Sequence, residues 1–202
     1  LILEDGTVFE GESIGSTREV ISEIVFNTSM TGYLEVLTDP SYAGQAVVMT
    51  YPLIGNYGIT PDMESARPWT DGYIVRELSR MPSNFRCEGT IQDFLRKNDI
   101  PGIAGIDTRA LTKLLREKGT MNGMITTNVY CEIEELLPRI QAYQTGNVVE
   151  KVTCKEKWVL KGGQKTAGKK VALLDFGAKN NIARSLAARG CEVTSYPAHT
   201  TA

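Results

Sequence analysis

The chain has 202 residues, of which 42% are hydrophobic and 23% charged, and its formal net charge is −2 at pH 7. This length and composition are typical of a folded protein with one large domain, or one domain and part of a second, and exclude a fibrous or disordered chain. Because basic and acidic residues are interleaved and no apolar run approaches the roughly 20 residues of a membrane span, we expect neither a nucleic-acid nor a membrane partner.

The first half of the chain has the pattern of strands and turns. Residues 1–4 and 8–9 flank the pair Asp5-Gly6, which is a strong hairpin signal. The N-terminus has no basic segment followed by a long apolar one, so we expect no secretion signal and a cytoplasmic location. Apolar or β-branched runs predict further strands at residues 20–27, 45–51, 72–76 and 102–106.

Helices are predicted only after these strands. The first is expected over residues 90–97 and the second over residues 108–118, where Asp107 can cap the N-terminus. In the second, leucines share one face and basic residues flank it, which predicts an amphipathic helix packed on a sheet. A third helix, over residues 132–143, contains Pro138, where we expect it to bend or break.

A change of composition near residue 153 predicts a domain boundary. The sequence KEKWVLKGGQKTAGKK is rich in Lys and Gly, which is typical of a connector. We therefore expect one domain over residues 1–152, a linker over residues 153–168 and a second unit over residues 169–202.

The second unit has the pattern of a strand, a helix and a strand. An apolar run at residues 171–175 precedes a helical pattern at 180–189 and a strand pattern at 191–196. This order predicts an α/β protein whose last part is the opening of a parallel α/β domain. Two parallel strands cannot cover their own sheet faces, so we expect the sequence to be a truncated piece of a longer protein.

One segment nearly matches a phosphate-binding loop. In residues 163–170, however, Lys170 stands where Ser or Thr should hold the magnesium ion. The segment also precedes a strand, whereas the true loop follows a strand and opens a helix. A flexible linker is the favoured interpretation, and an unrelated nucleotide-binding α/β protein is the weak alternative.

Cysteine and histidine give no sign of a metal site or a hydrolytic pair. The four cysteines are far apart, without a Cys-x-x-Cys pair, and the one histidine is His199. We expect no metal site, and each cysteine is expected to be reduced and partly buried. No cysteine lies in a Gly-x-Cys-x-Gly turn, so His199 is interpreted as an exposed loop residue. The cysteines are Cys87, Cys131, Cys154 and Cys191.

Residues 26–58 gather Thr, Ser, Asn, Gly and Pro between strand-like runs. Polar loop residues held by a rigid sheet often bind ligands. Within this segment Asp39, Pro40, Ser41 and Tyr42 predict a turn in which the side chain of Asp39 or Ser41 bonds to a neighbouring amide. Residue chemistry alone favours a turn-capping role for Ser41.

Several blocks of this sequence, in order and at sensible spacing, resemble one family, the small subunit of carbamoyl phosphate synthetase. The resemblance covers most of the chain, and only residues 131–170 are unspecific. The blocks are FNTSMTGYLEVLTDPSY, TYPLIGNYG, SNFR, GIAGIDTRALTKLLREKGTMNG and LLDFGAKNNIARSLAARGCEV.

The resemblance implies a fold and an activity. It implies an N-terminal layered β/β/α domain of the swivelling type, followed by the start of a class I glutamine amidotransferase domain. In that family a cysteine, assisted by a histidine and a glutamate, releases ammonia from L-glutamine. A large subunit then uses ATP, Mg²⁺ and bicarbonate to make carbamoyl phosphate for arginine and pyrimidine synthesis. The small subunit itself is expected to hold no cofactor.

The resemblance also implies two substrate-binding residues. Ser41 matches a serine that reaches across to glutamine, and Lys179, in the block DFGAK, matches a lysine that lines the same site. No catalytic residue maps onto this sequence, so we expect the 202 residues alone to be inactive. The alternatives are that Lys179 is a solvated residue at a helix start, and that the chain is a non-catalytic docking module for a large subunit.

Overall fold

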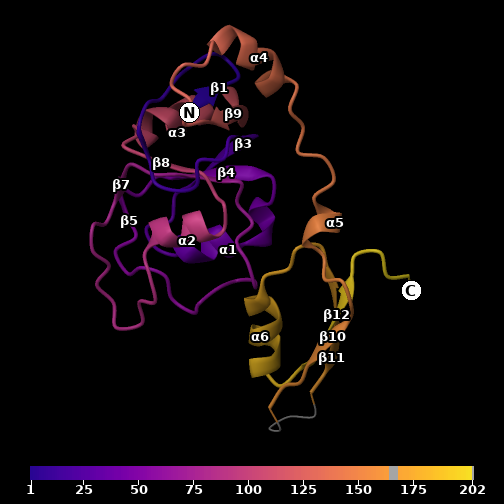
Figure 1. Ribbon diagram of the computed structural model, residues 1–202. Helices are drawn as coiled ribbons and strands as arrows, with labels where there is room; N and C mark the ends of the chain where they lie inside the picture. Colours follow the sequence, from indigo (N-terminus) through magenta and orange to yellow (C-terminus); the bar gives the residue numbers. More distant parts are fainter. Residues whose placement is uncertain (164–167, 202) are drawn as a thin grey trace.

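The computed structural model describes residues 1–163 and 168–201, which contain two α/β units (Figure 1). The first unit is built around a seven-stranded sheet with the order β1-β9-β3-β4-β6-β8-β2. Its strands are β1 (Ile2–Leu3), β2 (Glu12–Ser13), β3 (Val20–Asn27), β4 (Gln45–Met49), β6 (Gly72–Ile74), β8 (Gly102–Ala104) and β9 (Met121–Ile125). The short strands β5 (Leu53–Ile54) and β7 (Glu77–Leu78) pair in parallel as a separate sheet.

The centre of the large sheet is parallel and its edges are antiparallel. Strands β3, β4, β6 and β8 run in the same direction, whereas β9 and β2 join the two sides antiparallel. Strand β4 is buried on both faces, as its continuous apolar run requires. Val47 and Met49 pack in the hydrophobic cluster on one face, and Ala46 and Val48 pack in the cluster on the other.

Helices cover both faces of this sheet (Figure 1). Leu34 of α1 and Leu95 of α2 pack in the cluster that contains Val47, while Leu111 of α3 packs in the cluster that contains Val48. The helices are α1 (Tyr33–Thr38), a 3-10 turn at Pro40–Tyr42, α2 (Ile91–Lys97), α3 (Thr108–Lys118), α4 (Ile133–Gln141) and α5 (Val149–Val152).

The local predictions were largely confirmed, with three corrections. The predicted hairpin is present, with an antiparallel bridge between Ile2 and Val8 and a backbone hydrogen bond from Leu3 to Thr7 at 2.9 Å. Strand β1 also pairs with β9, a strand that was not predicted. Helix α1 precedes the first predicted helix, so the prediction that helices follow only after the strands was wrong. Helix α4 continues through Pro138 to Gln141 without the expected break.

The second unit confirms the predicted strand, helix and parallel strand. Strands β11 (Lys170–Asp175) and β12 (Glu192–Pro197) pair in parallel and are connected by α6 (Asn180–Ala188). The expected linker over residues 153–168 contains a strand, β10 (Trp158–Leu160), which pairs antiparallel with β12. Residues 164–167 of that linker lie outside the described residues.

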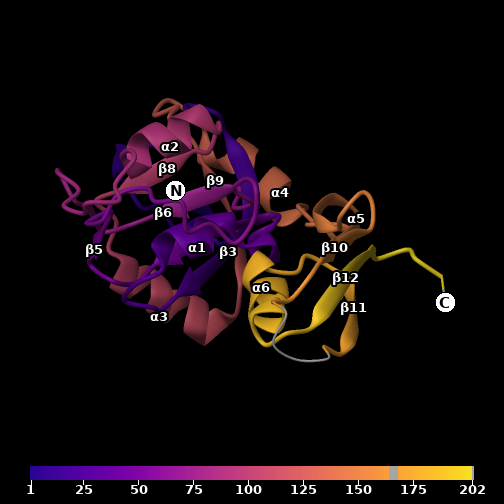
Figure 2. The same cartoon turned by 90° about the horizontal axis from the view of Figure 1, so that it is seen from below.

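Helix α6 lies on the side of the three-stranded sheet that faces the first unit (Figure 2). The amino end of α6 contacts the first unit, where the backbone N–H of Asn180 donates to the carbonyl of Glu64 at 2.9 Å. Among the described residues, no helix combines the length and the apolar character needed to cross a membrane.

Candidate functional site

Ser41 lies in the 3-10 turn that follows α1. Asp39 precedes this turn, and its Oδ1 accepts a hydrogen bond from the backbone N–H of Ser41 at 2.9 Å. Pro40 at the first position of the turn fixes the backbone there. The predicted turn is therefore present, but it is the side chain of Asp39 that caps it. The side chain of Ser41 is exposed, and the described part of the chain offers its hydroxyl no hydrogen bond.

Lys179 comes from the second unit, at the N-cap position of α6. Its ammonium Nζ lies 2.8 Å from Oδ2 of Asp39. This hydrogen bond raises the pKa of Lys179 above its ordinary value, although partial burial opposes the shift. Asp39 is only 8% exposed, so its two oxygens are committed to Ser41 and Lys179, and the two predicted residues are brought together from separate units.

Asp175 at the end of β11 shapes the loop that carries Lys179. Its Oδ1 accepts the backbone N–H groups of Gly177 at 2.9 Å and Ala178 at 2.7 Å. Its Oδ2 accepts the backbone N–H of Cys154 at 2.8 Å. Asp175 is buried, so these three bonds satisfy a carboxylate that water does not reach freely. The loop is thus fixed relative to the strand that precedes it.

Glu64 of the first unit holds the amino end of α6. Its carboxylate accepts the side-chain N–H of Asn181 at 2.9 Å and the backbone N–H of the same residue at 3.4 Å. A carboxylate in this place accepts a hydrogen bond from a backbone amide that has no partner within the helix. Its negative charge also interacts favourably with the positive end of the helix dipole. No local pattern of residues indicates this role, because the two residues are 117 positions apart.

A close backbone approach completes the contact between the units. Gly177 has a φ of +99°, and a Cβ built on it would lie 2.9 Å from Cγ2 of Val152 and 3.3 Å from Cβ of Pro40. Only glycine combines that conformation with that space. The loop before Lys179 is therefore packed directly on the residue that precedes Ser41.

These groups can bind a polar ligand but do not form a nucleophile and base pair. Among the described residues the hydroxyl of Ser41 makes no hydrogen bond, and the ammonium of Lys179, whose side chain is 45% exposed, has protons left after its bond to Asp39. Both are suited to the carboxylate or amide oxygens of a small amino acid. In the described chain, no group of three or more metal-ligating residues is found.

Cys154 and His199 line a common hollow of about 620 Å³ beside the ends of β11 and β12. Burial raises the pKa of the Cys154 thiol, whereas a reactive thiol needs a lowered pKa. The sulfur of Cys154 lies 3.9 Å from Oγ of Ser195, and no hydrogen bond joins it to His199 within the described residues. All four cysteines are free and partly buried, as predicted.

The segment that resembles a phosphate-binding loop lies partly outside the described residues, at positions 164–167. Its last residue, Lys170, begins strand β11 rather than a helix. That arrangement agrees with the interpretation that this segment is not a nucleotide-binding loop.

The ion pair between Asp39 and Lys179 is expected to make a small contribution to stability. For the full-length protein, a double-mutant cycle of Asp39→Asn and Lys179→Met should give a coupling of about 0.2–1 kcal/mol at neutral pH, because Lys179 is largely solvated. The folded-state pKa of Lys179 is raised, so this stabilisation is present below the ordinary lysine pKa and lost as the pH rises through the raised value. Urea unfolding at neutral pH and at a pH above the raised pKa of Lys179 measures the coupling energy. A coupling that is the same at both pH values would contradict the ion pair between Asp39 and Lys179.

The chain is similar to proteins of one family. Residues 1–125 match the family model described as carbamoyl-phosphate synthase small chain, CPSase domain. The carbamoyl phosphate synthase small chain of Clostridium perfringens (strain 13 / Type A) is 51% identical over 198 residues, which is 98% of this chain and 55% of that relative. The carbamoyl phosphate synthase pyrimidine-specific small chain of Halalkalibacterium halodurans is 46% identical over 204 residues, which is 100% of this chain and 55% of that relative. The chain therefore spans about half the length of the curated relatives it matches.

Proposed function

The chain belongs to the carbamoyl-phosphate synthase small-chain family, and we propose that it is part of the glutamine-using subunit of such a synthase. In this proposal the full-length subunit hydrolyses L-glutamine in the cytoplasm and supplies ammonia to a large subunit. The large subunit uses ATP, Mg²⁺ and bicarbonate to make carbamoyl phosphate for arginine and pyrimidine synthesis. The family match and the names of the relatives support this proposal.

We propose that the two units are the two domains of this subunit. The unit with the seven-stranded sheet is proposed to be the family's N-terminal swivelling-type domain, and β11, α6 and β12 are proposed to open the class I amidotransferase domain. The family model matches residues 1–125, which lie in the first unit, and the parallel pairing of β11 with β12 suits the second assignment.

The observation that carries the site assignment is the position of Asp39 between Ser41 and Lys179. We propose that the Ser41 hydroxyl and the Lys179 ammonium both contact glutamine, one from each unit. The 202 residues alone are expected to lack glutaminase activity, because no nucleophilic cysteine, histidine or glutamate is assigned among them.

A physical reason favours division of the work between two subunits. In water near neutral pH, ammonia is mostly protonated to ammonium, which has no lone pair with which to attack carboxyphosphate. A sheltered route delivers the neutral nucleophile and keeps water away from a reactive intermediate. The proposed small subunit must therefore bind the large subunit closely.

Ser41→Ala in the full-length subunit, assembled with its large subunit, tests the proposal. Loss of one neutral hydrogen bond should cost about 0.5–1.5 kcal/mol and raise the apparent KM for glutamine by up to about tenfold. Synthesis from added ammonia should be unchanged, because the large subunit then bypasses the glutamine site. Steady-state rates with each nitrogen source measure both effects.

Ser185→Ala is the matched control, since Ser185 is an exposed serine on α6 and its hydroxyl is not part of the Asp39 contact. It should leave both activities unchanged. Glutamine kinetics that are the same in Ser41→Ala and Ser185→Ala would remove Ser41 from the substrate site.

A further inference from the structure

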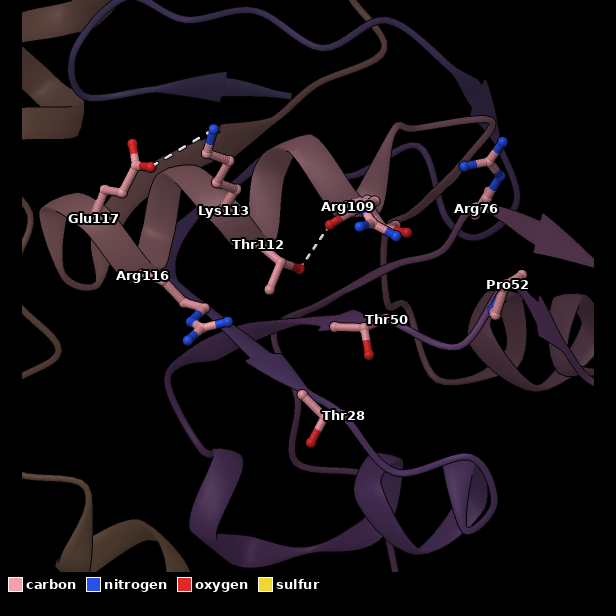
Figure 3. A pocket seen from close by; sticks show the side chains of 10 residues that line it. Thr28, Thr50, Pro52, Arg76, Arg109, Thr112, Lys113, Arg116 and Glu117 are labelled. Carbon is pink, nitrogen blue, oxygen red and sulfur yellow. Dashed lines mark hydrogen bonds and ion pairs between the residues drawn. The ribbon is translucent and has the colours of Figure 1, made fainter.

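An open groove of about 770 Å³ lies at the edge of the large sheet, away from the Asp39 contact (Figure 3). Thr28 follows the end of β3, Thr50 follows the end of β4, and Arg76 comes shortly after the end of β6. These strands are parallel, with Asn27 paired to Met49 in register, so their carboxyl ends share one edge. In α/β sheets, ligands commonly bind outside that edge.

Helix α3 forms the other wall of the groove and presents cations to it. Arg109, Lys113 and Arg116 lie at spacings of four and three residues, so they follow one side of the helix. Lys113 is paired with Glu117 at 3.8 Å. Figure 3 shows this pair pointing away from Thr28 and Thr50, whereas Arg116 extends toward the side on which those threonines lie.

Three guanidinium groups in this groove have no acidic partner within the part of the chain that the structure describes. Among the described residues, no carboxylate lies within 4 Å of the guanidinium nitrogens of Arg76, Arg109 or Arg116. The carboxylate of Asp107, at the start of α3, accepts the backbone N–H of Ala110 at 3.0 Å and so faces its own helix. The whole chain has a net charge of −2, so the positive charge is concentrated in this groove and is not a general property of the protein.

We propose that this groove binds a phosphate group, either as free phosphate or as a phosphate monoester. Guanidinium groups donate paired hydrogen bonds that match phosphate oxygens, and they keep their charge at any physiological pH. The threonine hydroxyls add neutral donors from the strand side, so donors surround the groove from two walls. A compact anion with several oxygens can accept hydrogen bonds from both walls of this groove. A partner protein with an acidic surface would instead fit a flat basic surface without hydroxyl groups.

The test is calorimetric titration of the full-length protein with inorganic phosphate and with ribose 5-phosphate at constant ionic strength. Arg109→Gln with Arg116→Gln should weaken binding at least about tenfold, because each variant removes charge-assisted hydrogen bonds. Arg76→Gln, on the opposite wall, should weaken it as well. Tighter binding of phosphate would identify the free ion as the ligand, and tighter binding of ribose 5-phosphate would identify the monoester.

The control is Arg80→Gln with Arg96→Gln, which removes the same charge from two exposed positions outside the groove. This variant should bind both probes as the unaltered protein does. No saturable binding of either probe to the unaltered protein would overturn the proposal, and so would equal loss in the two double variants. If neither probe binds but only the groove variant weakens assembly with a large subunit, the groove is a protein-docking face instead. None of these titrations involves glutamine, so the result is independent of the function proposed above.

Discussion

Replacement of Glu64 by alanine is expected to lower the free energy of unfolding of the full-length protein by about 2–4 kcal/mol. The carboxylate is only 8% exposed and accepts two hydrogen bonds from Asn181 at the start of α6. Removal leaves these donors without their acceptor, which costs about 1.5–3 kcal/mol for bonds to a charged group, and loses a further few tenths to 1 kcal/mol of interaction with the helix dipole. Urea unfolding measures the loss.

Under the proposed function, the same substitution should separate glutamine-dependent from ammonia-dependent synthesis by the full-length subunit assembled with a large subunit. Because α6 begins next to Lys179, the apparent KM for glutamine should rise while ammonia-dependent synthesis is retained. Glu64→Gln keeps an oxygen that can accept a hydrogen bond from Asn181. Its stability and its KM for glutamine should lie between those of the unaltered protein and of Glu64→Ala. Glu156→Ala, at an exposed position, is the matched control and should change stability by less than about 0.5 kcal/mol. If Glu64→Ala behaves like this control, Glu64 does not hold the helix.

Gly177→Ala is expected to be equally damaging, for a reason of space and backbone conformation together. The added Cβ would lie 2.9 Å from Val152 and 3.3 Å from Pro40, and the φ of +99° is strained for any other L-residue. The conformation costs about 1–2 kcal/mol and forced repacking about 1–3 kcal/mol more. Since the loop cannot stay against Pro40, Lys179 should move away from Asp39, and under the proposed function the KM for glutamine should rise.

Gly146→Ala separates these two causes. Gly146 also has a positive φ, of +70°, but a Cβ there would meet nothing within 4 Å. It should therefore lose only the conformational part, about 1–2 kcal/mol. Equal losses in urea unfolding for the two variants would mean that the close approach of Gly177 to the first unit contributes nothing to stability.

Elements with local signals were predictable from the sequence. Helix α3 has the bounds expected for it, because a capping residue, a 3.6-residue apolar repeat and a terminal glycine all lie within a dozen positions. Strand β3 also has its expected bounds. In contrast, α1 has six residues and its N-cap, Gly32, makes no side-chain hydrogen bond, so no start signal marks it.

Strand β9 was not predicted, and its sequence contains a signal that favours a turn. Asn122 and Gly123 form a pair that is typical of a tight turn. In the fold, Gly123 serves a different purpose, since a Cβ there would lie 2.7 Å from the side chain of Ile24 on the adjacent strand. The glycine allows β9 to pack closely against β3, and only knowledge of that neighbour reveals the need for it.

The candidate site was predictable in part and only through family resemblance. Ser41 and Lys179 have no local feature that separates them from a turn serine and a solvated lysine. Either Asp39 or Ser41 was expected to cap the turn, but the bond from Asp39 to Lys179 joins positions 140 residues apart. Glu64 was not expected at all. These contacts depend on how the two units pack against each other. The spacing of residues within either unit does not predict that packing.

The pairing of β1 with β9 determines the order in which the chain can fold as it is made. Ile2 and Leu3 are nearly inaccessible in the finished fold, and their partners are Met124 and Gly123. On a ribosome that adds about 5–20 residues per second, the first strand therefore waits on the order of ten seconds for its partner. During that interval an apolar segment has no sheet to join, and chaperones have time to bind it.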